Sequence, residues 1–199
     1  MDEYQLIFEE RFVNRKLSPV LKVLHITRSI TALFLIWTAW LSEVSGQSAS
    51  EYQVKAVFIY NFTRFIDWPS EAFKSPDEPF IIGIIGEDPF GTYLDETVTG
   101  EKIGTHPIQI QRFADIKQVV KCHILYVSSY EPEEAEKILS AVADKSILTV
   151  SDATAFNKWG GMIRFFTENN KIRLQVNVEA SKKSGLTISS KLLGVAQIY

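Results

Sequence analysis

The stretch from Glu51 to Pro69 constrains the fold most, because its apolar residues recur at helical spacing around most of its circumference. A helix of this kind is expected to be packed on two sides, which makes it a central element of a domain. Proline disfavours helical geometry at the preceding residue and has no amide proton, so we expect the helix to end at Trp68. Its apolar residues are Tyr52, Val54, Ala56, Val57, Phe58, Ile59, Phe62, Phe65, Ile66 and Trp68.

The sequence before this helix has the order of a secretory signal. Basic residues precede an uncharged apolar run over residues 30–41, and small or medium-sized residues follow that run. This order predicts an N-terminal extension and signal peptide over residues 1–46, cleavage between Gly46 and Gln47, and a periplasmic protein. The run is shorter than the roughly 20 residues of a spanning helix, so we expect no stable membrane insertion after cleavage. An uncleaved N-terminal anchor is the alternative.

Residues 47–199 are long enough for one domain with a substantial core. The whole chain has 21 Lys+Arg and 24 Asp+Glu, and these are interspersed without a basic patch, so nucleic acid is not expected as a partner. Cys122 is the single cysteine, which excludes a disulfide within one chain. It is either buried and inert or available for a bridge between chains.

Short apolar runs alternate with helical segments through the middle of the chain. The runs 80–85, 123–127 and 147–150 are typical of strands covered on both faces, and residues 107–113 alternate like a strand at a sheet margin. This alternation predicts a single three-layer α/β domain with a mostly parallel sheet and helices on both faces. The helices expected between the strands span residues 90–97 and follow residues 128–132.

The C-terminal part departs from this rhythm. Residues 162–167 and 171–176 flank Asn169 and Asn170, and asparagine tolerates the left-handed geometry of tight turns. We therefore predict a C-terminal antiparallel hairpin at the sheet margin. Two further helices are expected, over residues 177–184 and 189–198.

The loops that follow the predicted strands are the candidate ligand- or partner-binding surface. In open α/β sheets, ligands bind outside the carboxyl ends of the strands. The glycines near residues 86–91 match neither the dinucleotide nor the P-loop spacing, so no particular nucleotide is indicated. The candidate residues are Asp88, Phe90, Gly91, Ser128, Tyr130, Asp152, Gly160 and Gly161.

The sequence offers no catalytic or metal-binding motif. His106 and His123 have no partners at metal-ligand spacing, so neither a metal nor a cofactor is expected. Ser128, Ser129 and Ser151 follow strands but lack the Gly-x-Ser-x-Gly elbow of a nucleophilic serine. We therefore predict a protein that is not an enzyme.

Six segments of the chain form a recognisable series: 65–69, 84–91, 122–128, 147–152, 160–163 and 188–193. In this order they resemble the YfiR family of secreted bacterial proteins, and the resemblance covers about residues 50–199. It implies a periplasmic α/β protein that dimerises and represses an inner-membrane diguanylate cyclase by binding its periplasmic sensor domain. Release of that repression would raise cyclic-di-GMP and promote biofilm formation. The resemblance also implies several cysteines and a disulfide, whereas this chain has only Cys122.

These observations together predict a periplasmic regulatory binding protein. It would repress or modulate a membrane sensor protein, either a diguanylate cyclase or the periplasmic domain of a histidine kinase, and would form a homodimer. A periplasmic small-ligand carrier without a protein partner is one alternative, and a serine-type hydrolase is the second.

Overall fold

The computed structural model describes residues 44–199, and it describes side chains from Glu51 onward. Residues Ala49–Tyr199 form one compact unit. The predicted signal peptide lies outside the described residues except for its last three, which begin helix α2 (Val44–Phe62). Among the described residues, no helix is long and apolar enough to cross a membrane.

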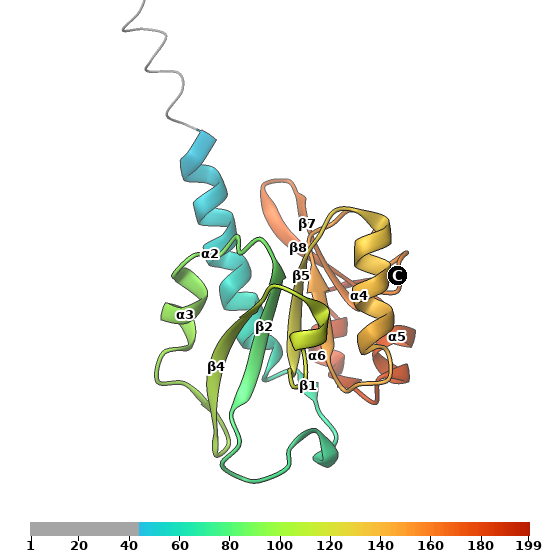
Figure 1. The fold of residues 1–199 in the computed structure, drawn as a ribbon. Helices are drawn as coiled ribbons and strands as arrows, with labels where there is room; N and C mark the ends of the chain where they lie inside the picture. Colours follow the sequence, from blue (N-terminus) through green and yellow to red (C-terminus); the bar gives the residue numbers. More distant parts are fainter. Residues whose placement is uncertain (1–43) are drawn as a thin grey trace, which may run out of the picture. The chain divides into compact units, whose positions relative to one another are not determined.

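The described residues form the predicted α/β fold around an eight-stranded sheet with the order β10-β8-β7-β6-β5-β2-β4-β3 (Figure 1). Strands β4, β2, β5, β6 and β7 run parallel to one another, as the sequence predicted. Strand β3 is antiparallel to β4, and the hairpin strand β8 is antiparallel to β7. The strands are β2 (Phe80–Gly86), β3 (Lys102–Ile103), β4 (His106–Phe113), β5 (Ile124–Ser128), β6 (Leu148–Ser151), β7 (Ile163–Glu168), β8 (Lys171–Val176) and β10 (Gln197–Ile198).

Each face of the sheet buries its own apolar core. On one face, α2 packs against alternate residues of the central strands, including Ile84, Tyr126 and Phe165. On the other face, α4 (Pro132–Val142) packs against the remaining residues of β2 and β5, and the segment containing Phe156 joins it. The predicted helices on both faces are therefore confirmed. The shorter helices are η1 (Ser70–Ala72), α3 (Tyr93–Val98), η2 (Ile116–Gln118), α5 (Val178–Lys183) and α6 (Ser190–Leu193).

The opening helix ends at Phe62, so the prediction that it continues to Trp68 is wrong. Three residues in tight turns follow it, and the Thr63 hydroxyl donates a hydrogen bond to the carbonyl of Tyr60 at 2.6 Å. The chain then extends as β1 (Ile66–Asp67), which pairs antiparallel with β9 (Thr187–Ile188). A backbone partner more than a hundred residues away therefore ends the helix well before Pro69.

The exposed side of α2 also differs from the prediction. Val54 and Val57 are 43% and 48% exposed, whereas Lys55 is only 2% exposed. The helix is therefore buried on one side, and its buried side includes a charged residue that the apolar pattern did not indicate.

The hairpin of β7 and β8 is confirmed, and its geometry follows from its two-residue turn. Asn169 and Asn170 have φ angles of 51° and 56°, the left-handed conformation that asparagine tolerates. The predicted helix over 177–184 is confirmed as α5, and the side chain of Asn177 caps it by accepting a hydrogen bond from the amide of Ala180 at 3.0 Å.

The last predicted helix, over 189–198, is wrong beyond its first turn. Helix α6 ends at Leu193, and the chain then forms the edge strand β10 beside β8. Sheet pairing again determines the conformation of a segment whose local pattern suggested a helix.

The neutral imidazole of His123 holds the start of β5 in place. Its Nδ1 accepts a hydrogen bond from the amide of Ile81 at 3.0 Å, so the proton lies on Nε2, which faces the carbonyl of Ala72 at 3.3 Å. The ring packs against both Phe73 and Phe80, at centroid distances of 4.7 and 4.5 Å. Burial lowers the pKa of His123 to about 4.

We expect the free energy of unfolding to fall as the pH is lowered from about 6.5 towards 4. The unfolded chain binds a proton at His123 near its ordinary pKa, whereas the folded chain binds it only near pH 4. The loss should be of the order of 2 kcal/mol, measured by urea unfolding at several pH values. The variant His123→Asn keeps an acceptor for Ile81 but cannot bind a proton, so its stability should fall less. Parallel pH profiles for the two proteins would contradict this assignment.

Candidate functional site

The carboxyl ends of the parallel strands bring six of the eight predicted site residues to one edge of the sheet. Strands β2, β5 and β6 end at Gly86, Ser128 and Ser151. Ser128 is thus the last residue of β5, and the other predicted residues lie in the loops that follow the three strands. These six residues are Asp88, Phe90, Gly91, Ser128, Tyr130 and Asp152.

Asp152 is the centre of a polar cluster at this edge. Its Oδ2 accepts hydrogen bonds from the Lys55 ammonium at 2.6 Å and from the Tyr52 hydroxyl at 2.9 Å. Its Oδ1 accepts one from the Tyr130 hydroxyl at 2.9 Å. Because Tyr52 and Lys55 both lie on α2, this cluster joins the helix to the ends of β5 and β6. The Lys55 ammonium also forms an ion pair with Glu51 at 2.7 Å.

The charges of this cluster compensate one another. Burial alone would raise the pKa of Asp152, but the hydrogen bond and charge of Lys55, together with the two tyrosine hydroxyls, hold it below its ordinary value. Burial and the charge of Asp152 raise the pKa of Tyr52 and Tyr130, so both phenols stay protonated and continue to donate. The cluster therefore holds an ionised carboxylate in a largely enclosed place.

Tyr126 and Phe90 lie beneath this cluster. Tyr126 is 0% exposed, and its hydroxyl has no hydrogen-bond partner among residues 51–199. The ring of Phe90 contacts the rings of Tyr126 and Tyr52 edge-on, at centroid distances of 4.7 and 5.6 Å. Phe90 is thus a buried core residue and supports the two tyrosines rather than presenting an open surface.

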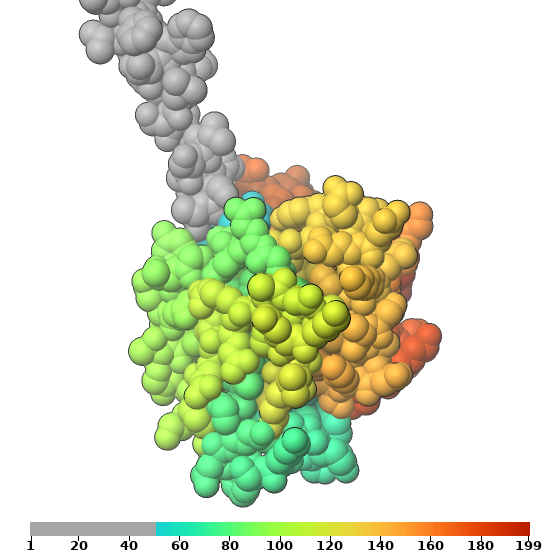
Figure 2. Space-filling view, in the orientation of Figure 1, coloured from blue at the N-terminus to red at the C-terminus, as the bar shows by residue number. Residues whose placement is uncertain are grey.

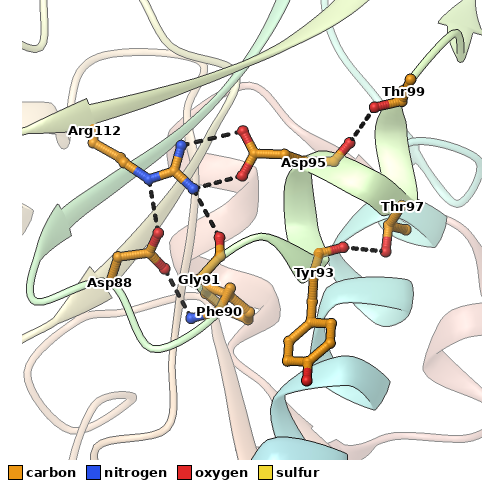
Figure 3. Close-up of polar contacts among 8 residues, drawn as sticks. All are labelled: Asp88, Phe90, Gly91, Tyr93, Asp95, Thr97, Thr99 and Arg112. Carbon is orange, nitrogen blue, oxygen red and sulfur yellow. Dashed lines mark hydrogen bonds and ion pairs between the residues drawn. The ribbon is translucent and has the colours of Figure 1, made fainter.

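Asp88 and Gly91 are held by Arg112 of β4 (Figure 3). The guanidinium donates to Asp88 at 2.7 Å, to the carbonyl of Gly91 at 3.0 Å, and through two nitrogens to Asp95 of α3. The other oxygen of Asp88 accepts a hydrogen bond from the amide of Phe90 at 2.8 Å. Hydrogen bonding by Arg112 lowers the pKa of Asp95. This Arg112 clamp fixes the loop between β2 and α3.

Gly86 allows β2 and β5 to approach each other at the same edge. Its φ is 92°, and a Cβ placed there would lie 2.6 Å from the carbonyl oxygen of Ser128. Any larger residue would separate the two strand ends that carry the site.

Gly160 and Gly161 lie at the opposite edge of the sheet. They precede β7, which runs parallel to β6, so the segment between Asp152 and Gly160 returns the chain to the edge where strands begin. The ring of Phe156 occupies the space where Gly161 would carry a Cβ. The structure therefore separates these two glycines from the other six predicted residues.

Gly160 borders a cavity of about 290 Å³ between α4, α5 and the start of β7. Its floor includes Leu139, Val142 and Met162, and Thr149 and Asn177 contribute polar atoms. Glu179 and Lys183 of α5 also line it. The cavity is large enough for a small molecule, and none of the residues that line it belongs to the Asp152 cluster.

Two of the three serines that follow strands, Ser129 and Ser151, are engaged in structural hydrogen bonds. The buried Ser151 hydroxyl donates to the carbonyl of Val127 at 2.6 Å, and the Ser129 hydroxyl donates to Glu134 at 2.7 Å. His123 lies at the start of β5, whereas Ser128 and Ser129 follow its end. No group of His, Cys, Asp and Glu in the described part of the chain could hold a metal ion.

Cys122 is buried, and burial raises the pKa of its thiol to about 12. Of the two possibilities left open by the sequence, the folded protein favours an inert core residue over a bridge between chains, because a protonated, enclosed thiol reacts slowly.

Sequence reasoning did not identify Tyr52, Lys55, Tyr126 or Arg112 as site residues. The apolar pattern includes Tyr52 in the first helix and Tyr126 in a buried strand, and it gives no role to Lys55. The local signal for Lys55 is a charged residue whose helical neighbours three and four residues on, Phe58 and Ile59, are apolar.

We expect the Lys55–Asp152 pair to behave as a coupled unit. Breaking a buried pair leaves an uncompensated charge, so Lys55→Met and Asp152→Asn should each lower the free energy of unfolding by about 3 kcal/mol. The double variant removes both charges and should lose clearly less than the sum of the two single losses. Urea unfolding of the four proteins measures this coupling, and additive losses would show that the pair is not a unit.

Removal of the Arg112 clamp should loosen the loop at 87–92 more than it destabilises the domain. The guanidinium is partly exposed, so Arg112→Gln should cost only about 1 kcal/mol in global stability. Hydrogen exchange of the Phe90 amide, which is bound to Asp88, should become faster. Unchanged exchange throughout this loop would show that Arg112 does not order it. Lys182→Gln, in an exposed pair on α5, provides the matched control.

Comparison with known proteins places this fold in a family. Residues 52–197 match the family model described as YfiR/HmsC-like (DUF4154), so the match includes α2 from Tyr52 onward, the sheet except its last residue, and all six residues at its carboxyl edge. A search of curated proteins finds no match to the chain. Because the family model spans most of the chain, this protein belongs to the YfiR/HmsC-like family.

Proposed function

We propose that this protein is a periplasmic regulatory binding protein that represses or modulates an inner-membrane signalling receptor. The family match over residues 52–197 carries this proposal, because it spans the whole domain. The receptor is a diguanylate cyclase, so that release of the protein raises cyclic-di-GMP and promotes biofilm formation. The chain reaches the periplasm through its signal peptide, acts as a homodimer and performs no catalysis.

Regulation of this kind requires a difference in binding free energy. A signal can release the receptor only if it binds the free regulator and the receptor-bound regulator with different affinities. The carboxyl edge of the sheet is suited to such coupling, because the Asp152 cluster links α2 to the loops after β5 and β6. A change at either element is therefore transmitted to the other.

The exposed side of α2 is the proposed contact surface for the receptor. Val54 and Val57 are large apolar residues in solvent on the helix that the Asp152 cluster holds in place. Tyr130, also exposed, extends this surface across the loop after β5. Exposed apolar residues of this kind favour association with another protein.

Small-ligand carriage is the second candidate function, and the cavity beside α4 and α5 favours it. This cavity combines an apolar floor with polar atoms from Thr149 and Asn177, which is the general composition of ligand sites. A carrier without a protein partner would leave receptor signalling unaffected, and this separates the two functions.

Deletion of the gene should raise cellular cyclic-di-GMP, because the cyclase loses its repressor. Wild-type protein should restore the low level, whereas the double variant Val54→Glu/Val57→Glu should fail, since charges on the exposed side of α2 would prevent receptor contact. Cyclic-di-GMP is measured by mass spectrometry in each strain, together with the amount of periplasmic protein. An unchanged level on deletion would exclude a diguanylate cyclase as the partner.

Val120→Glu is the control for this experiment. Val120 is 84% exposed and lies outside α2, so the charge is added to a residue of the same type on another surface. It should restore the low level as wild type does. Equal failure of Val120→Glu would show that the loss reflects added charge rather than the surface of α2.

A further inference from the structure

One side of the β7–β8 hairpin belongs to neither apolar core. Ile163, Phe165 and Leu174 point into the core beneath α2. The residues between them point to the opposite side, which is the side that α4 occupies over β2 and β5. We name this second group the basic strand face; it consists of Arg164, Phe166, Arg173 and Gln175.

The two arginines of the basic strand face lack a strong acidic partner. Arg164 is half-buried, its Nε donates to Gln175 at 3.1 Å, and its guanidinium lies 5.0 Å from the ring centre of Phe166. No carboxylate lies within ion-pair distance of Arg164 among residues 51–199. Arg173 has a single long contact with Glu168, at 3.6 Å. The Phe166 ring is itself only partly buried, and a partly desolvated cation beside it favours an anionic partner.

Helix α4 presents the complementary charge on the same side of the sheet. Its apolar residues Ile138, Leu139 and Val142 face the sheet, which leaves its acidic residues in solvent. In Figure 2, α4 forms the yellow-orange surface on the right of the visible side. We name Glu131, Glu133 and Glu136 the acidic helix face; none of them forms an ion pair with any residue that the structure describes.

A second copy of the chain provides an oppositely charged partner for both the basic strand face and the acidic helix face. In an interface with two-fold symmetry, each residue contact occurs twice with the roles exchanged. Because the acidic and basic faces lie on the same side of one molecule, such a rotation can place each against its opposite in the partner copy. Phe166 would then become buried between the two copies.

We propose that two copies associate through this side of the sheet, with the acidic helix face of each copy against the basic strand face of the other. This proposal specifies the surface of the homodimer included in the proposed function. It concerns the isolated protein and therefore stands or falls independently of receptor binding.

The test is a charge exchange followed by analytical ultracentrifugation of protein purified from cells that express the full chain. Arg164→Glu/Arg173→Glu makes the strand face acidic, and Glu133→Lys/Glu136→Lys makes the helix face basic. Each variant alone places like charges together, so its self-association should weaken by about tenfold or more. An equimolar mixture should recover association, because both contacts of the mixed pair again join opposite charges.

Wild-type self-association should also weaken with added salt. Lys182→Glu/Lys183→Glu, a charge reversal on α5, should associate as wild type does. If Arg164→Glu prevents folding, as judged by circular dichroism, Arg173→Glu alone replaces the first variant.

Three results would overturn the proposal. They are a monomeric wild-type protein, charge-reversal variants that self-associate as strongly as wild type, and a mixture of folded variants that remains monomeric. The first of these would favour an acidic partner of another kind. A monomeric protein would also remove the homodimer from the proposed function, whereas receptor regulation is measured separately by cyclic-di-GMP.

Discussion

The contact between the Lys55 ammonium and the Asp152 carboxylate is the interaction on which the arrangement of this domain depends. It connects the first helix to the end of the fourth parallel strand, and the neighbouring tyrosines satisfy the remaining oxygen positions of the carboxylate. A charge pair removed from water is seldom a net gain in stability, but it requires its partners to meet in one geometry. Burial of the apolar side of α2 stabilises its contact with the sheet, and this charge pair determines how the helix is placed there.

The family assignment and the geometry give a consistent account of the molecule. Nearly every polar group at the carboxyl edge is already engaged by another residue of the chain: Asp88 by Arg112, Asp152 by Lys55 and two tyrosines, and Ser151 by a backbone carbonyl. An edge occupied in this way is organised for rigidity. Such an edge is compatible with the regulatory role proposed above.

The sequence predicted the layers of the fold because these depend on local patterns. Continuous apolar runs indicated the buried strands, and the adjacent asparagines indicated the hairpin turn. The end of α2 and the strand β10 could not be predicted in this way, because distant strands determine both. A helix-like pattern is overridden wherever the backbone finds a partner in a sheet.

The candidate site could be predicted only in part, for a related reason. Residues that directly follow parallel strands share an edge, so Asp88, Tyr130 and Asp152 were placed together. Gly160 was grouped with them as well, but it lies at the opposite edge. The segment before β7 crosses the sheet without forming a helix that would have marked the crossing. Lys55 could not be predicted as a site residue, because a buried lysine is expected only where a carboxylate partner is known.

The short strand β10 has a consequence for how the protein behaves at high concentration. It pairs only with Gln175 and Val176, so the outer side of β8 from Lys171 to Leu174 has no strand beside it among the described residues. Lys171 and Arg173 occupy this margin, and cationic side chains there oppose the stacking of further strands from other molecules. The sheet is thereby protected against open-ended aggregation, while a closed assembly of defined size remains compatible with its surface.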